Sequence, residues 1–445
     1  MMAWRARIAL PLRGARVEDG RVYMRAMDSR FGRRMTRPTG ALELMNDLGE
    51  AAAIASMRPV HMLGGGNPAR IPAVEAVYRR RLAEIGANDA EFGRFAASYS
   101  APAGDAGFRA AVAELLEREY GWPLASHNIA LTAGSQTAFF ALFNLLAGER
   151  DGEETSRILL PLAPEYIGYA DLGLSDDQLV SRRARIEDSG DGFFKYRPDF
   201  DALEGIDRVA ALCVSRPTNP TGNVLTLDEL RRLDEMAQRR GVPLIVDAAY
   251  GLPFPGLQYS DAGCLWNENI ILCLSLSKLG LPGTRTGVVV AHEDIIEAVT
   301  AFNATAALAP ASTGAVITEP LIRSGELLDL CRTTIRPYYE GRCREAVEEL
   351  RTALGDLPMS IHQPEGAFFL WLWFPGLPIT SHQLYQRLKK RGVFVLSGHH
   401  FFPGLDEPWP HAHECLRINY SQARDSVRAG IAAIAEEVRR AFQEG

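Results

Sequence analysis

Residues 270–287 read Ile-Ile-Leu-Cys-Leu-Ser-Leu-Ser-Lys-Leu-Gly-Leu-Pro-Gly-Thr-Arg-Thr-Gly, an apolar run followed by a lysine, glycines and an arginine. Its first five residues are apolar and typical of a buried strand, and Lys278 follows just after that strand. The chain has only four lysines among its 48 basic residues, so arginine supplies most of its surface charge. Removing water from an ammonium group lowers its pKa and makes the amine a nucleophile. A strand-end lysine that reaches solvent is the structural alternative, and the stretch alone leaves both readings open.

Polar residues also follow two other strand-like runs. Asp247 ends the apolar run at 243–247 and precedes Tyr250 by three residues, while Asn219 begins an Asn-Pro-Thr-Gly turn after the run at 209–214. In open α/β sheets, ligands bind beyond the carboxyl ends of the strands. We therefore expect these side chains to meet Lys278 at one edge of a sheet.

Helix-like and strand-like segments alternate from about residue 104. Helical spacing of apolar residues predicts helices at 104–120, 137–146 and 227–240. Short apolar runs predict strands at 157–162, 209–214, 243–247, 270–274 and 287–291. This alternation predicts an α/β fold with a mainly parallel sheet covered by helices.

The pattern changes after about residue 320. A long helix is expected at 321–354 with a break at Pro337, and further helices at 381–391 and 424–442. Strands are expected at 367–373 and 415–420. We therefore predict a large domain at 28–320 and a smaller α+β C-terminal domain at 321–445, with the N-terminal segment of the large domain joining the small one.

Residues 1–27 are predicted to be a disordered N-terminal extension. The extension carries several arginines and no acid before Glu18, a feature it shares with transit peptides. It has no apolar core of the kind found in secretion signals, and we favour a plain extension.

The composition excludes several functions. The net charge is −7 and the isoelectric point about 5.8, which argues against nucleic acid as a partner. Six cysteines without a Cys-x-x-Cys pair are typical of reduced thiols and predict a cytoplasmic protein. The longest apolar stretch, 367–374, is far shorter than the ~20 residues that cross a bilayer, so no membrane association is expected.

The ordered set of motifs resembles a known family. Asn219-Pro-Thr-Gly222, Asp247-x-x-Tyr250 and Ser275-x-Ser-Lys278 with Arg285 are similar to the fold-type-I aminotransferases, which use pyridoxal 5'-phosphate (PLP). Longer stretches resemble one branch, the valine–pyruvate aminotransferases, and the similarity as a whole spans roughly residues 28–440. They are 161–169, 213–222, 275–283, 364–374, 400–405 and 408–411.

The resemblance implies roles around the PLP ring. Lys278 would bind the aldehyde and later move a proton, and Asp247 would pair with the ring nitrogen. Tyr250 and Asn219 would hydrogen-bond the ring oxygen, and Tyr166 would stack on the ring. Taken alone, these residues also fit a helix cap, a turn and core tyrosines.

The phosphate of PLP would occupy a second set of residues. Ser135 and Gln136 stand at a predicted helix N-terminus, where free N–H groups favour an anion. Ser275 would add a hydroxyl and Arg285 a guanidinium. By the resemblance, Tyr99 would reach the phosphate of a neighbouring subunit, which predicts a homodimer.

For the substrate, the resemblance implies that Arg417 binds the α-carboxylate together with Asn219. Gly65 and Gly66, in the sequence Gly64-Gly-Gly-Asn-Pro68, would belong to a loop that closes over the substrate. The expected partners are small amino acids and 2-oxo acids. The expected reaction moves the amino group of L-valine to pyruvate and gives 3-methyl-2-oxobutanoate and L-alanine.

Other functions stay open at this point. The chain could be an aminotransferase for other neutral or aromatic amino acids, or a PLP-dependent lyase. An aminotransferase-like regulator would need a DNA-binding module, and the ~40 residues ahead of the core are few for such a domain.

Two further patterns suggest other chemistry. Ser275-x-x-Lys278 fits the Ser-x-x-Lys motif of penicillin-binding enzymes, but no Lys-Thr-Gly follows it. Histidines 399, 400, 411 and 413 with Cys415 could suggest a metal site. Their spacing is not that of a zinc finger, and we expect no metal there.

Overall fold

The computed structural model describes residues 29–37, 39–54, 59–150 and 153–444. The described residues before Gly40 form a unit of their own with one helix, α2 (Arg30–Met35), whose N-cap Ser29 accepts a hydrogen bond from the Gly32 N–H at 2.9 Å. The elements described below belong to the second unit, which begins at Gly40. The predicted extension at 1–27 lies outside the described residues.

The larger sheet has eight strands and is mainly parallel, as predicted. Six strands run in one direction, while β11 and β3 run in the other. The connection from β10 to β11 is too short for the crossover that parallel strands need, so β11 is antiparallel. Across the sheet the order is β2 (Ile129–Thr132), β11 (Gly287–Val290), β10 (Ile270–Ser275), β9 (Leu244–Asp247), β8 (Val209–Ser215), β4 (Glu153–Ala163) and β3 (Gly148–Arg150), and β5 (Leu179–Arg183) also pairs with β4.

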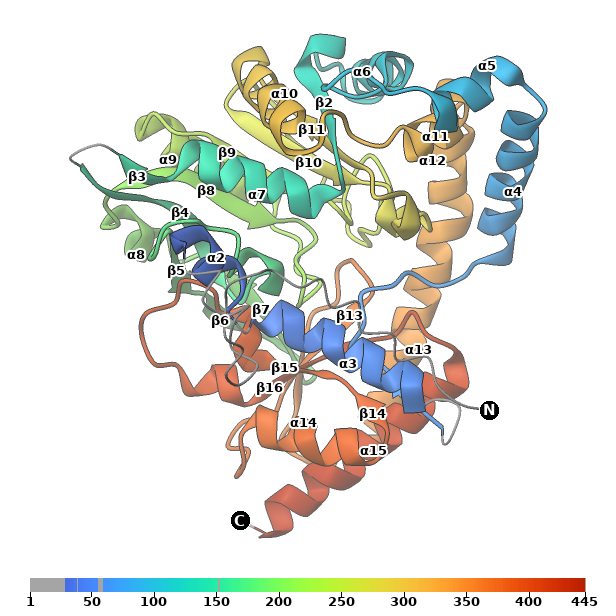
Figure 1. The fold of residues 1–445 in the computed structure, drawn as a ribbon. Coiled ribbons are helices and arrows are strands. Elements are labelled where there is room, and N and C mark those ends of the chain that lie inside the picture. Colours follow the sequence, from blue (N-terminus) through green and yellow to red (C-terminus); the bar gives the residue numbers. More distant parts are fainter. Residues whose placement is uncertain (1–28, 38, 55–58, 151–152, 445) are drawn as a thin grey trace, which may run out of the picture. The chain divides into compact units, whose positions relative to one another are not determined.

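Helices cover both faces of this sheet because alternate residues of each strand point to opposite sides (Figure 1). Ile271 and Cys273 of β10 join a core with residues of α7 (Ser135–Leu146) and α10 (Glu293–Ala307). Leu272 and Leu274 join a second core on the other face. Helices α6 (Ala106–Tyr120), α9 (Leu227–Arg239) and α11 (Thr313–Arg323) contribute to that second core.

The predicted α+β character of the C-terminal region is also confirmed, by a six-stranded sheet with helices beside it (Figure 1). The order is β15 (Leu396–Ser397), β16 (Cys415–Asn419), β13 (Phe369–Trp373), β12 (Ser360–His362), β7 (Phe193–Arg197) and β6 (Arg185–Gly190). The accompanying helices are α13 (Arg336–Leu354), α14 (Ser381–Lys390) and α15 (Arg424–Glu444).

Two earlier segments of the chain pair with C-terminal strands. The hairpin β6–β7 joins the second sheet through parallel pairing of β7 with β12, and the sequence patterns did not indicate this. Strand β1 (His61–Met62) pairs with β14 (Val393–Phe394). The domain boundary near residue 320 stays a prediction.

The helical region at 313–354 differs from the prediction. Instead of breaking at Pro337, it is interrupted at Gly325, which has a φ of 82° between α11 and α12 (Glu326–Leu330). A π-helical turn, Cys331–Ile335, then leads directly into α13. Pro337 is the second residue of α13, which directly follows this turn.

The remaining helices of the second unit are α3 (Gly40–Ile54), α4 (Pro72–Gly86), α5 (Asp89–Phe92) and α8 (Phe200–Glu204). Within the described parts of the chain, no helix has both the length and the apolar character that crossing a membrane requires.

Candidate active site

The carboxyl ends of three neighbouring strands bring predicted residues together. Ser215 of β8 and Cys273 of β10 are both in register with Asp247, the last residue of β9. Ser275 ends β10, and a 3₁₀ turn, Ser277–Leu279, carries Lys278 beyond it. The parallel pairing of these strands thus creates the polar edge expected from the sequence.

The amine of Lys278 is held inside this edge. Its Nζ donates a hydrogen bond to the Gly66 carbonyl oxygen at 2.8 Å and lies 5.2 Å from the ring centre of Tyr250. Burial, with the nearby Arg417 cation, lowers the pKa of Lys278 to about 8, although Asp247 opposes the shift. The amine therefore loses its proton more readily than that of an ordinary lysine.

The carboxylate of Asp247 is buried and held by two donors. The Tyr169 hydroxyl donates to Oδ2 at 2.7 Å, and the Ala249 N–H donates to Oδ1 at 2.9 Å. Burial raises the pKa of Asp247, while these hydrogen bonds and Lys278 act in the opposite direction. An anion fixed in this way suits a protonated ring nitrogen as its partner.

Sequence reasoning missed Tyr169 and Glu165. Glu165 accepts hydrogen bonds from the Ser215 N–H and the Ser215 hydroxyl, both at 2.7 Å, and burial raises its pKa to about 7. Both residues flank Tyr166 in a stretch that resembled the family, but no local signal marks them. Their partners lie 50 and 78 residues further along the chain.

Arg417 is a buried cation in β16. It is 1% exposed, and its Nη1 donates to Asn219 Oδ1 at 2.8 Å while its Nη2 donates to the Gly64 carbonyl oxygen. Its guanidinium carbon lies 4.1 and 5.3 Å from the ring centres of Phe369 and Phe401.

These partners leave Arg417 able to bind an anion. Both of its hydrogen-bond acceptors are neutral, and its Nε is buried without a partner. Burial lowers the pKa of Arg417 to about 10, so it is still charged at neutral pH. A buried charge with neutral partners is costly unless a counterion arrives.

The start of α7 and Arg285 form a cradle for an anion. Ser135 is the first residue of α7, and Gly134 before it has a φ of 87°. A Cβ at position 134 would clash with the Arg285 guanidinium, which would have to shift to make room for it. Free N–H groups, a helix dipole and a guanidinium are the donors that a phosphate requires.

The two other predicted phosphate residues are Ser275, which ends β10, and Gln136, the second residue of α7. Ser275 is buried, and its Oγ accepts a hydrogen bond from the Ser277 N–H at 3.2 Å. Gln136 instead directs its Nε2 to the Gly168 carbonyl oxygen at 2.9 Å.

The glycine-rich loop is fastened to both sides of the site. The Gly65 carbonyl oxygen accepts from Asn419 Nδ2 at 2.6 Å, and the Gly66 carbonyl oxygen accepts from Lys278. A cavity of about 700 Å³ opens beside this loop and Lys278. Its lining includes Met62, Asn67, Arg70, Tyr338, Tyr339 and Ser421.

Two of the three predicted tyrosines, Tyr250 and Tyr166, pack against other aromatic rings, and Tyr99 does not join them. Tyr250 packs edge-on against Phe368, with ring centres 5.1 Å apart, and Tyr166 packs edge-on against Tyr169 at 5.2 Å. Tyr99 is not brought into this group and is 87% exposed.

Residues 74–434 match the family model "Aminotransferase class I and II". The chain belongs to this family. It is 47% identical over 419 residues to the valine–pyruvate aminotransferase of Escherichia coli K12, covering 94% of this chain and 99% of that protein.

Two solved structures are similar to this aminotransferase over nearly their full length. A putative amino-acid aminotransferase from Psychrobacter arcticum has a TM-score of 0.90 and 46% identity, covering 94% of this chain and 99% of the other. The valine–pyruvate aminotransferase of Salmonella typhimurium has a TM-score of 0.84 and 46% identity, covering 91% of this chain and 100% of the other.

The cofactor of this family is PLP, and the site fits it. The chain supplies an amine with a lowered pKa, a fixed buried carboxylate and an anion cradle that a side chain at Gly134 would fill. These are the groups that PLP requires for its aldehyde, its ring nitrogen and its phosphate.

Proposed function

We propose that this aminotransferase moves the amino group of L-valine to pyruvate, giving 3-methyl-2-oxobutanoate and L-alanine. The observation that carries the proposal is the buried guanidinium of Arg417, which lies between aromatic rings close to Lys278. The identity to the Escherichia coli enzyme supports the same reaction.

Arg417 would bind the α-carboxylate of the substrate, with its unpartnered Nε and its fork of N–H groups as donors. Phe369 and Phe401 would then provide apolar walls for a small neutral side chain. The lining of the nearby cavity contains one arginine, Arg70, which is paired with Glu75 at 2.6 Å. A second substrate carboxylate would therefore find no ready partner there.

Lys278 would act as the nucleophile toward the cofactor aldehyde and as the base and acid at the substrate α-carbon. When bound, PLP supplies an electron sink for the electrons released at that carbon. Asp247, fixed by Tyr169, would keep a proton on the ring nitrogen. Tyr250 and Asn219 would hydrogen-bond the ring oxygen, and Tyr166 would pack on the ring.

Ser135, Ser275, Arg285 and the backbone N–H of Gln136 would hold the phosphate. Gly65 and Gly66 would close over the substrate, and their carbonyl oxygens accept hydrogen bonds from Asn419 and Lys278. We further propose that the enzyme is a cytoplasmic homodimer, in which the exposed Tyr99 completes the phosphate site of the partner subunit.

A half-reaction experiment tests the substrate. Valine, alanine and 2-aminobutyrate should convert bound PLP to its amine form, and pyruvate should reverse the change. Aspartate and glutamate should be poor donors because burying an unpaired carboxylate is costly. A kcat/KM for aspartate, glutamate or an aromatic donor above that for valine would contradict the proposed substrate while leaving aminotransfer intact.

A further inference from the structure

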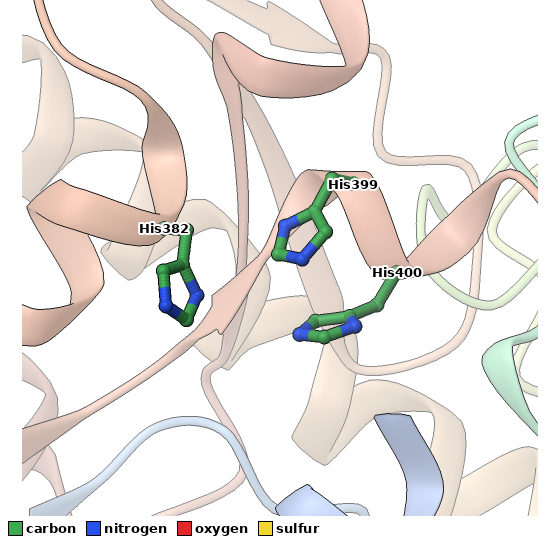
Figure 2. A group of neighbouring side chains, drawn as sticks. All are labelled: His382, His399 and His400. Atoms are coloured by element: carbon green, nitrogen blue, oxygen red, sulfur yellow. The ribbon is translucent and has the colours of Figure 1, made fainter. Parts of the chain in front are cut away.

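Three histidines outside the active site come together in the second unit. His382 lies in the first turn of α14, and His399 and His400 lie in the 3₁₀ turn Gly398–Phe401. One ring nitrogen of each lies within 4.8 Å of the others. Figure 2 shows the three rings grouped together, with His382 approaching from one segment and His399 and His400 from the other.

The hydrogen bonds around these rings leave nitrogens free. His399 Nδ1 bonds Ser397 Oγ at 2.7 Å, which orients the ring and leaves its Nε2 for another partner. His382 Nδ1 is buried and has no hydrogen-bond partner. His400 Nε2 lies 3.5 Å from the Glu43 carboxylate, a contact at the long limit of an ion pair.

Simple packing explains this arrangement poorly. Three imidazoles whose ring nitrogens lie this close together would repel one another if charged, so the arrangement favours neutral rings. Neutral imidazoles with an unpartnered buried nitrogen lose hydrogen bonds to water without gaining others.

We propose that His382, His399 and His400 bind one divalent transition-metal ion, with Zn²⁺ the best suited. Neutral imidazole nitrogens suit zinc, copper and nickel, and three of them form a common zinc ligand set. With Zn–N distances of about 2.0–2.1 Å, tetrahedral ligand atoms lie ~3.4 Å apart, so the rings need to close by no more than about 1.5 Å. Glu43 or water would take the fourth position.

Residue order explains why the sequence predicted no metal. His399 and His400 were noted with His411, His413 and Cys415, but His411 Nε2 instead contacts the Tyr196 hydroxyl and Cys415. His382 lies 17 residues before His399, on a different helix, and only folding joins it to the pair.

The site would brace one wall of the substrate pocket. Phe401, next to His400, lies over the Arg417 guanidinium, and its carbonyl oxygen accepts from the Glu165 N–H at 2.7 Å. A metal joining α14 to this turn would hold that segment in place without touching substrate or PLP. Because binding to the folded state stabilises it, added Zn²⁺ should raise the melting temperature.

The test uses tag-free, PLP-loaded enzyme stripped with a chelator and titrated with ZnCl₂ by calorimetry. We expect one Zn²⁺ per chain in the wild type and binding at least about tenfold weaker in His382→Gln and in His399→Gln. His127→Gln removes an exposed histidine in another part of the chain and should bind like the wild type. Circular dichroism and the PLP spectrum verify that each variant is folded.

Visible d–d bands after CoCl₂ addition give a readout that needs no variant. A spectrum typical of four-coordinate Co²⁺ with imidazole ligands, reached at one Co²⁺ per chain, supports the proposal. Absence of this spectrum, or equal Zn²⁺ binding in the wild type and both site variants, would overturn it. Transamination is measured separately, so the outcome is independent of the proposed reaction.

Discussion

At the scale of single residues, the site depends on two ionisable groups, Lys278 and the buried Asp247, whose surroundings shift their pKa values in chemically useful directions. Lys278 has a pKa lowered to about 8 and Asp247 a raised pKa, and burial is the largest cause in both cases. Desolvation disfavours the charged form of each. Such opposed shifts within one site are typical of catalytic residues.

Lys278 should therefore react with PLP at lower pH than an ordinary lysine. Only the unprotonated amine attacks, so the attachment rate in the apoenzyme should rise with pH and level off above about 8, instead of near 10.5. Stopped-flow absorbance after mixing apoenzyme with PLP measures this profile. A midpoint near 10.5 would contradict the prediction, and Lys278→Ala should show no attachment and no turnover.

Tyr169 should prove to be a positioning residue that acts through Asp247. In Tyr169→Phe the carboxylate loses one of its two donors, a hydrogen bond of about 1.5–3 kcal/mol, so kcat should fall by roughly tenfold or more while KM changes little. The acidic limb of the kcat–pH profile should also move to higher pH, because the lost hydrogen bond held the pKa of Asp247 down.

The control for Tyr169→Phe is Tyr385→Phe, which breaks another buried tyrosine–aspartate hydrogen bond, to Asp47, away from the site. This variant should lose stability but keep its kcat and pH profile. If both variants behave alike, the role of Tyr169 is structural only.

At the scale of elements, the N-terminus of α7 would contribute to PLP binding. Gly134→Ala should weaken PLP binding at least about tenfold, because its Cβ would displace the Arg285 guanidinium and a φ of 87° strains any side chain. The dissociation constant for PLP, measured by fluorescence titration of the apoenzyme, tests this.

Gly121→Ala is the matched control for that element. Gly121 has a φ of 69° at the end of α6, and a Cβ there would meet nothing within 4 Å. The variant should lose about 1 kcal/mol of stability with unchanged affinity for PLP. Equal affinity losses in both variants would mean that a general loss of stability, not the change at the phosphate cradle, is responsible.

At the scale of the whole molecule, the exposure of Tyr99 suggests that one chain does not complete the site. Tyr99→Ala and Lys278→Ala should each be impaired, yet mixed dimers of the two should recover activity. One site of the mixed dimer would combine an intact Lys278 with the intact Tyr99 of the other subunit. Recovery in co-refolded mixtures supports the dimer, whereas a fully active monomer in analytical ultracentrifugation would contradict it.

Local patterns in the sequence were sufficient for the α/β architecture and for the group around Lys278. Strand and helix periodicity depends on neighbouring residues, and parallel strands necessarily bring their carboxyl ends to one edge. Asp247, Asn219 and Lys278 could therefore be placed together before the fold was known. Arg417 stood out only through resemblance to a family, because arginines are common in this chain.

Only the tertiary structure joined residues whose partners lie far away in the chain. The Tyr169–Asp247 hydrogen bond, the pairing of β7 with β12 and the approach of His382 to His399 have no local signal. Their geometry depends on how sheets and helices pack, which a pattern of period 2 or 3.6 does not specify. The sequence thus determined the chemistry that the site can carry, while packing determined which side chains orient it.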